Sequence, residues 1–522
     1  MKIRELVSAL PECPLDTGLM PHAEEMGFSR KKYLTFAFIV SASALFLGML
    51  LAPPGLCLPS ALLFFAASAY ALLKLPEVAY RKKISGMEAE LPLALRTLGM
   101  FLEFGVPFKT ALEHSAEGRG PLSDEMKKAV AEIRRGAGVT AAFSCLGRHL
   151  GSTDLKRALT QITSSYQRGG RGAEILAVAD GLLSGQKHRM RMGASKQAVF
   201  SLLFIVITAV VPAFMLLFAS LGEYSPFPQL SGGSFALLFL VLLPLISAAL
   251  LAASSFFLPR SILGEGDFPW RSLLLVLAAA LLFAALQLLS LPSLPVLLLI
   301  LIAFSAFAYP RYEKERRREQ LEEQLPTAVF SAAGEESRGL SAIFSSMADA
   351  EGPLGEEAQA SLKQIKAKVK QEKVLEDFWS RNSSPLLHRF CTFLNHALHA
   401  GHGISKHLSL LANDMLSIAE LRKERAQVLS MQKYTLVFGA LIVPFILGSS
   451  LSLSSRIAEA SSEPAPAGLS MVIPAYLVFY SLLASAFISQ AEGKASSLYL
   501  YFVLLSLLST SVFYVFSGIS PV

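Results

Sequence analysis

ELPLALRTLGMFLEFGV, residues 90–106, returns later in the chain in altered form as QLPTAVFSAAGEESRGL, residues 324–340. Each stretch begins with a Leu-Pro pair one residue in and ends on a glycine followed by an aliphatic residue. The prolines Pro92 and Pro326 lie 234 residues apart, and so do the glycines Gly105 and Gly339. An equal spacing at both ends of the stretch indicates a repeated unit.

Further matches extend the repeat in the C-terminal direction. They are 232 residues apart, and they pair Pro121 with Pro353, Gly169 and Gly170 with Gly401 and its neighbours, and Pro212 with Pro444. One gap of two residues between residues 106 and 121 accounts for the change of spacing. An ordered series with a single gap favours an internal duplication. The alternative is two unrelated helical domains that share Leu, Gly and Pro.

The composition is that of a membrane protein. Of 522 residues, 53% are hydrophobic and only 17% are charged, and the mean hydropathy is +0.49. Soluble domains are less apolar and carry more charge, so a polytopic membrane protein is expected. The four cysteines show no CxxC spacing and are expected to be packed or free thiols, so no disulfide framework is implied.

The order of apolar and polar segments predicts an all-α protein with about nine transmembrane helices and two long polar regions. Apolar residues in those regions recur at helical spacing, as at Leu91, Leu95, Leu98 and Leu102, so each is expected to form a helical bundle. We call residues 74–196 module 1 and residues 310–431 module 2. The other expected segments are a leader (1–32), a transmembrane hairpin (33–73), transmembrane helices 3–4 (197–257), a loop (258–271), transmembrane helices 5–6 (272–309) and transmembrane helices 7–9 (432–522).

The distribution of basic residues predicts the orientation. With the N-terminus and both modules in the cytoplasm and the C-terminus outside, the outer loops contain almost no Lys or Arg, Arg456 excepted. This is the positive-inside pattern. We therefore expect a multi-pass protein of the cytoplasmic membrane.

Ion-coupled transport is disfavoured by the spans themselves. Coupled transporters place ionisable side chains near the bilayer midplane, but the most polar side chain deep in an expected span here is Gln287. A channel without such residues stays open as an alternative.

Residues 264–267, Gly-Glu-Gly-Asp, match the GxGD signature of intramembrane aspartyl proteases, including the peptidases that process prepilins. Such an enzyme needs two aspartates that share a proton. The spans before Asp267 contain no Asp. A glycine-rich cytoplasmic turn is therefore favoured, and the peptidase is kept as an alternative.

Five histidines cluster in module 2, between His388 and His407. His396 and His399 are spaced for one helix face and could bind a metal, but no acidic residue or cysteine lies in register. Solvated or partly buried histidines are the simpler interpretation. No GxxxxGK[ST] loop is present, so nucleotide hydrolysis by this chain is not expected. We expect no cofactor, no metal and no catalytic residue.

Basic residues lie deeper in both modules, away from the expected spans. They are either solvated helix faces or docking surfaces for an acidic partner. The residues are Lys127, Lys128, Arg134 and Arg135 in module 1 and Lys363, Lys366, Lys368 and Lys370 in module 2.

The repeated pattern of Leu-Pro, Gly-aliphatic, late glycines and a proline-bearing span resembles the platform proteins of type IV pilus-like machines. These are the F component of type II secretion, the TadB and TadC proteins of tight-adherence pili and the J component of archaella and archaeal pili. The quoted residues are Pro92, Gly105, Gly169, Gly170, Pro212, Pro326, Gly339, Gly401 and Pro444. About nine spans are similar to the archaeal J type.

The resemblance implies a non-enzymatic platform in the membrane. Such proteins contact a hexameric secretion ATPase through their cytoplasmic modules and couple it to the assembly of pilin-like or archaellin-like subunits. Membrane lipids and a second copy in a homodimer are further expected partners, and nucleic acid is not. We expect Lys127, Lys128, Arg134 and Arg135 to contact the ATPase, and the glycines and prolines above to have structural roles.

Overall fold

The computed structural model describes residues 33, 35–43, 57–116, 120–149, 152–169, 171–220, 238–255, 270–288, 293–334, 339–382, 384–400, 404–461, 469–492 and 494–518. These residues are almost entirely helical, as expected for an all-α protein. The leader, residues 53–55, the GxGD segment at 264–267 and residues 290–292 lie outside the described residues.

The helices repeat in the same order in the two halves. The first set is α3 (Cys57–Glu103), α4 (Phe108–Ser115), α5 (Pro121–Arg134), α6 (Val139–His149), α7 (Thr153–Gln167) and α8 (Gly172–Ser220). The second set is α12 (Ser293–Gly334), α13 (Leu340–Ala348), α14 (Pro353–Lys366), α15 (Gln371–Asn382), α16 (Pro385–Ala400) and α17 (Ile404–Ser461). Each helix from α13 to α17 begins 232 residues after its counterpart from α4 to α8. The structure therefore supports an internal duplication.

In the structure, the two-residue gap between the two copies lies earlier in the chain than the sequence predicts. Gly105 follows the end of α3 with φ +77°, and Val106 N donates to Phe101 O over 3.0 Å, as at a glycine-terminated helix. Gly339 instead precedes α13 as its N-cap, which is the position of Pro107 before α4. The two glycines therefore have different roles, and the gap lies before α4 rather than after it.

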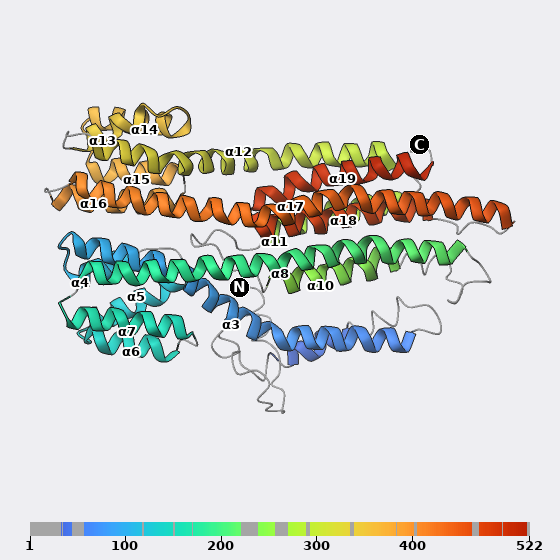
Figure 1. Ribbon diagram of the computed structural model, residues 1–522, viewed down its shortest axis with the longest axis horizontal. Helices are drawn as coiled ribbons and strands as arrows, with labels where there is room; N and C mark the ends of the chain where they lie inside the picture. Colours follow the sequence, from blue (N-terminus) through green and yellow to red (C-terminus); the bar gives the residue numbers. More distant parts are fainter. Residues whose placement is uncertain are drawn as a thin grey trace.

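Four long helices join the modules to the apolar part of the molecule. In Figure 1 the short helices α4–α7 and α13–α16 gather at one end, while α8, α12 and α17 run on toward the other. The helix α8 contains 49 residues and passes without a break through the predicted boundary at residues 196–197. At 1.5 Å per residue it is about 70 Å long. A displacement of one module can thus be carried by continuous helices.

Four described segments are long and apolar enough to cross a membrane, and five if a bent pair at residues 295–334 counts as one. They are Gly172–Phe218, Leu408–Ile457, Val472–Glu492 and Ser496–Ser517. Two shorter apolar segments, Leu238–Ser254 in and before α10 (Leu243–Ser255) and Val276–Leu286 in α11 (Trp270–Leu288), coincide with other expected spans. The predicted number of about nine is not established by these helices.

The helix α18 (Leu469–Glu492) lies at the centre of the apolar part, with 94% of its most apolar window buried by other helices. Its Tyr476 hydroxyl donates to the Thr208 carbonyl of α8 over 2.8 Å. That carbonyl lies four residues before Pro212, which has no N–H to donate to it. The contact thus satisfies a backbone acceptor that the proline leaves open. The last helix, α19 (Ala495–Ser517), packs beside α18.

Candidate functional site

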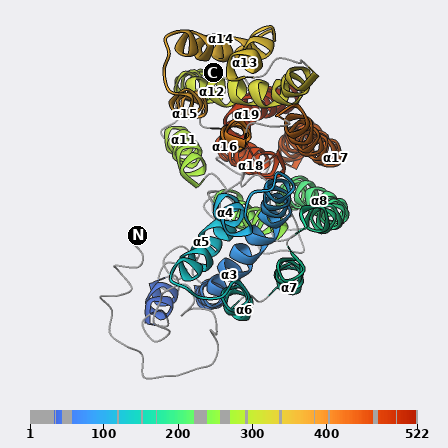
Figure 2. The same ribbon diagram turned by 90° about the vertical axis from the view of Figure 1, so that its left-hand side faces the viewer.

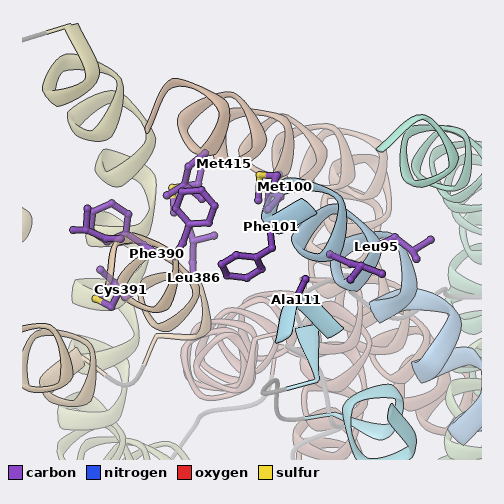
Figure 3. Close-up of a cluster of buried hydrophobic side chains, with 14 of the residues drawn as sticks. Leu95, Met100, Phe101, Ala111, Leu386, Phe390, Cys391 and Met415 are labelled. Carbon is purple, nitrogen blue, oxygen red and sulfur yellow. The ribbon is translucent and has the colours of Figure 1, made fainter. Parts of the chain in front are cut away.

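The two modules meet along an aromatic contact between α3–α4 and α16. Phe101 lies 5.8 Å from Phe393 and Phe104 lies 4.8 Å from Phe393, measured between ring centroids. The His114 and His396 rings lie 3.8 Å apart. Figure 3 shows Phe101 and Met100 of module 1 facing Leu386, Phe390 and Met415 of module 2. The buried side chains of both modules form one continuous cluster, so the modules are a single packed unit.

A buried group of charges lies in the same interface. Arg96 of α3 approaches Asp414 of α17 with Nη1 2.8 Å from Oδ1, and Arg389 of α16 approaches the other oxygen at 2.9 Å. The Asp414 side chain is 5% exposed. Burial lowers the pKa of the Arg389 guanidinium, while Asp414 beside it raises the pKa and Arg96 lowers it further. The Asp414 carboxylate therefore pairs with two guanidiniums. At the edge of the interface, Asp180 of α8 lies 2.9 Å from Arg96.

The interface joins different faces of the two copies. Around the aromatic contact, module 1 contributes α3 and α4, whereas module 2 contributes α16, which is the counterpart of α7. The counterpart helices α8 and α17 also meet, with Lys187 Nζ 3.7 Å from Glu424. Figure 2 shows α4 and α16 in the middle of the stack, with α7 and α13 toward its opposite ends. A two-fold relation would pair like faces. At the aromatic contact the modules instead present unlike faces, head to tail, which the sequence repeat alone does not reveal.

One buried polar contact is present in both modules. The Ser152 hydroxyl, which caps α7, donates to Glu88 of α3, and the Ser384 hydroxyl before α16 donates to Glu322 of α12. Each serine oxygen also accepts from a backbone N–H, Leu155 N at 3.4 Å in module 1 and Leu387 N at 3.2 Å in module 2. Our reasoning from the sequence missed these residues. The signal was available, because each glutamate stands four residues before the proline of the Leu-Pro pair.

The basic residues beside the expected spans form ion pairs within the modules. Lys83 Nζ lies 2.9 Å from Glu125 on α5, and Arg317 lies 3.8 Å from Glu357, the residue at the matching position of α14. Burial raises the pKa of Glu125, but hydrogen bonds from Lys83 and Lys128 hold it below its usual range. These ion pairs therefore connect helices within each module, in addition to any effect of the basic residues on the orientation of the protein in the membrane.

The four residues expected to contact an ATPase lie on one helix and are all exposed. Lys127, Lys128 and Arg134 belong to α5, and Arg135 is its C-cap. Lys127 lies 3.9 Å from Asp124 and Lys128 lies 3.0 Å from Glu125. Their charges are accessible and are partly balanced within the module.

Arg134 has the closest acidic neighbour of the four. Its Nε donates to Glu113 of α4 over 2.9 Å, which lowers the pKa of Glu113 and raises that of Arg134.

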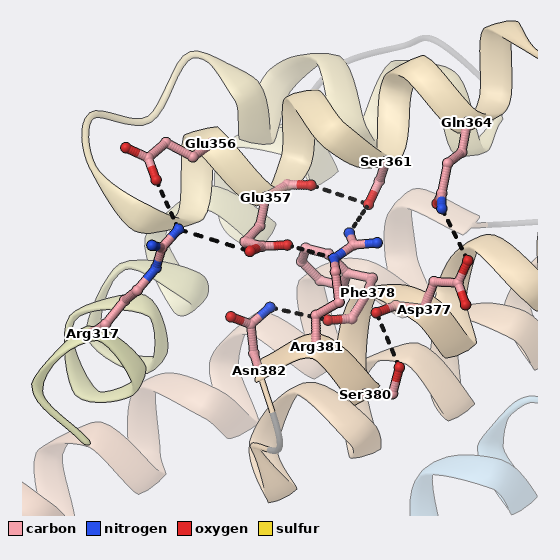
Figure 4. A network of polar contacts seen from close by, with 10 residues as sticks. All are labelled: Arg317, Glu356, Glu357, Ser361, Gln364, Asp377, Phe378, Ser380, Arg381 and Asn382. Carbon is pink, nitrogen blue, oxygen red and sulfur yellow. Dashed lines mark hydrogen bonds and ion pairs between the residues drawn. The ribbon is translucent and has the colours of Figure 1, made fainter. Parts of the chain in front are cut away.

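In module 2 the helices α14 and α15 form an antiparallel hairpin joined by polar contacts (Figure 4). Arg381 Nε donates to Glu357 over 2.8 Å and its Nη2 to the Ser361 hydroxyl over 3.3 Å. Nearer the turn, Gln364 donates to Asp377 over 2.9 Å. Arg317 of α12 reaches Glu356 at 2.8 Å from the other side. The hairpin is thus fixed both internally and to α12.

The residues that carry the family resemblance have structural positions. Pro92 lies inside α3 and Pro326 inside α12, and Pro212 and Pro444 lie inside the long helices α8 and α17. Gly169 follows α7 with φ +98°. Gly170 and Gly401 lie outside the described residues.

Of the two histidines weighed as a metal pair, His396 lies at the module interface, and the side chain of His399 is outside the described part of the structure. His396 faces His114 and Phe101 across the module interface, and His402 is outside the described residues. In the part of the chain that the structure describes, no three His, Cys, Asp or Glu residues are grouped so that they could hold a metal ion.

Comparison with known proteins returned one family. The family model of the type II secretion system (T2SS) protein F matches the chain twice, over residues 94–220 and 328–451. Both matches begin in the helix before the module's short helices and end in the long helix that leaves it. No curated protein and no solved structure gave a match.

Proposed function

Since this chain carries two domains of the type II secretion system protein F family, we propose that it is the membrane platform on which a type IV pilus-like filament is assembled. Proteins of this family are non-catalytic platforms in the inner membrane. In the proposal, the modules receive motion from a cytoplasmic hexameric secretion ATPase, and the membrane part receives pilin-like or archaellin-like subunits. The archaeal form of the machine is proposed because the expected span number is similar to that type.

The observation that carries the proposal is the construction of the long helices. In each half one helix begins in the module and continues into an apolar segment, as α8 and α17 do. The packed interface around Phe101 and Phe393 makes the two modules move together. A force applied to the modules would therefore reach both membrane segments at once.

The apolar part has the surface that lateral contact with subunit helices requires. Side chains such as Leu202, Phe214, Phe438 and Phe445 are exposed along α8 and α17. Helices in a membrane associate by van der Waals packing against such surfaces. These faces contact lipid, and in the proposal they also receive the apolar helices of filament subunits.

The proposal is tested with the full chain in lipid nanodiscs and the secretion ATPase of the same cell. Binding and ATP turnover are followed at low and at higher salt, with wild type compared with Arg134→Glu plus Arg135→Glu. Binding that weakens with salt and alters turnover is expected. Weaker binding of the double variant would assign α5 to the contact.

Two alternatives make different predictions. A GxGD peptidase would cleave a prepilin and lose that activity on Asp267→Asn, whereas the platform would be unaffected by this change. A channel would conduct solute into vesicles without the ATPase. Prepilin cleavage, solute flux, or a chain that binds no ATPase when correctly folded would each contradict the platform proposal.

A further inference from the structure

Five lysines surround the turn that joins α14 to α15, and all five are exposed. They form what we call the lysine corner: Lys363, Lys366, Lys368, Lys370 and Lys373. Arginines elsewhere in module 2 lie against carboxylates, as Arg381 does at 2.8 Å from Glu357 and Arg422 at 2.7 Å from Glu322. Within the described residues, by contrast, no carboxylate lies within ion-pairing distance of the lysine corner. The positive charge of the lysine corner is therefore exposed and is not balanced by a neighbouring carboxylate among the described residues.

The hairpin beneath the lysine corner is held in one shape. Arg381 and Arg317 engage Glu357 and Glu356, and Gln364 engages Asp377 (Figure 4). These contacts occupy Glu356, Glu357 and Asp377, three of the acidic side chains of the hairpin. A charged surface on a fixed backbone loses less conformational entropy on binding than one on a mobile loop.

The backbone at Lys368 supplies a second and independent observation. Lys368 has φ +60°, the left-handed conformation that glycine adopts without cost, and it is the one described residue other than glycine with a positive φ. Its counterpart in module 1 is Gly136, with φ +100°. Both positions end their helix in the same way, because Lys368 N donates to Ile365 O and Gly136 N to Ile133 O. A lysine where the fold favours glycine points to a role for its side chain.

The matching turn of module 1 has little of this charge. Its counterparts to Lys363, Lys370 and Lys373 are Ala131, Gly138 and Ala141, and Lys366 corresponds to Arg134, which is paired with Glu113. The module 1 turn keeps the exposed Arg135, which forms no ion pair among the described residues, whereas the turn of module 2 carries a cluster of five lysines.

We infer that the lysine corner is a docking surface for an acidic face of a cytoplasmic protein, and specifically of the secretion ATPase, so that module 2 supplies a contact beyond that of α5. The inference rests on the proposed function for the identity of this partner. An acidic protein fits better than an anionic membrane because exposed Glu372 and Glu376 share the hairpin with the lysines. A uniformly negative surface would repel both glutamates, whereas a protein can place basic residues opposite them.

The test compares two full-length variants in nanodiscs of zwitterionic phosphatidylcholine. Lys363→Glu, Lys366→Glu and Lys370→Glu are combined in one. The control combines Lys156→Glu, Arg157→Glu and Lys423→Glu, which changes the net charge equally at exposed positions away from the hairpin. Binding of the purified ATPase is measured between low and physiological salt. The corner variant is expected to bind about tenfold more weakly or worse and with a smaller salt dependence, and the control to bind as wild type does.

Acylation of the five lysines, followed by mass spectrometry, gives a direct readout on the unaltered chain. Protection of the lysine corner by the ATPase is expected. Protection by phosphatidylglycerol in the nanodisc without the ATPase would overturn the inference in favour of the membrane surface. Equal binding by the corner and control variants, both folded by circular dichroism, would also overturn it while leaving the proposed function intact. A wild-type chain that does not bind the ATPase would instead remove the proposed function itself.

Discussion

At the scale of single residues, Asp414 is the carboxylate between two buried arginines that belong to different modules. Asp414→Asn would leave Arg389 close to Arg96 without a counter-charge of its own, and Arg96 with only the exposed Asp180 beside it. Breaking a buried ion pair from one side costs about 3–5 kcal/mol, so a clear fall in the thermal unfolding temperature is expected, measured by circular dichroism in detergent.

The matched control for this change is Asp180→Asn. Asp180 contacts the same Arg96 at 2.9 Å but its side chain is 59% exposed. Exposed pairs contribute about 0–1 kcal/mol. Equal effects of the two substitutions would contradict the assignment of Asp414 as the centre of the group.

A substitution at Lys368 is expected to raise the thermal stability of the chain instead of lowering it. Lys368→Gly relieves a left-handed backbone that costs a non-glycine residue about 1 kcal/mol, so the chain should become more stable toward thermal unfolding. The reverse change in module 1, Gly136→Ala, should destabilise by about the same amount, since a side chain at Gly136 meets no other atom and only the backbone conformation opposes it. A Lys368→Gly chain no more stable than wild type would show that the turn relaxes without strain.

At the scale of helices, the Tyr476 hydroxyl joins α18 to the proline-bearing part of α8. Tyr476→Phe leaves the Thr208 carbonyl without a donor in an apolar environment, which costs about 1–2 kcal/mol. Tyr480→Phe is the control, because in the described part of the chain the buried Tyr480 hydroxyl has no hydrogen-bond partner. Thermal unfolding in detergent should separate the two variants, and equal stabilities would count against the role given to Tyr476.

The packing of α5 on α3 should weaken in acid. Burial raises the pKa of Glu125, but hydrogen bonds from Lys83 and Lys128 hold it below its usual value of 4.5. A lowered pKa contributes stability above the unfolded value, and this stability is lost as pH falls through the lower folded value. Thermal unfolding followed from pH 7 to pH 3.5 should show this loss. It should be smaller in Lys83→Met, and an identical pH profile for wild type and variant would refute the assignment.

At the scale of the whole molecule, the head-to-tail interface can be tested through the duplication itself. Phe393→Ala removes a ring that touches Phe101 and Phe104 of the other module, a loss of about 3–5 kcal/mol for a buried phenylalanine. Gln161→Ala alters the matching position of α7, at the outer end of the stack. Hydrogen exchange of α4 and α16 should accelerate in the first variant and stay unchanged in the second. Faster exchange in both would contradict the arrangement.

The sequence predicted the repeat, the helical modules and the family because these depend on local spacing, such as the Leu-Pro pairs at Pro92 and Pro326. It did not predict how the modules face each other. That depends on Phe101, His114, Phe393 and His396, which have no counterparts of the same type in the other copy. The ion pair of Arg317 with Glu356 was also beyond prediction, because only the fold brings the two side chains together.

Joining the two modules in one chain has a consequence for how the pair forms. Two separate module-bearing proteins would associate in proportion to their abundance, and dilution would part them. Here the chain between α8 and α12, which includes α10 and α11, holds the faces of Phe101 and Phe393 in one molecule, so that their contact is intramolecular. Every molecule therefore contains both modules in contact, at any number of copies in the cell.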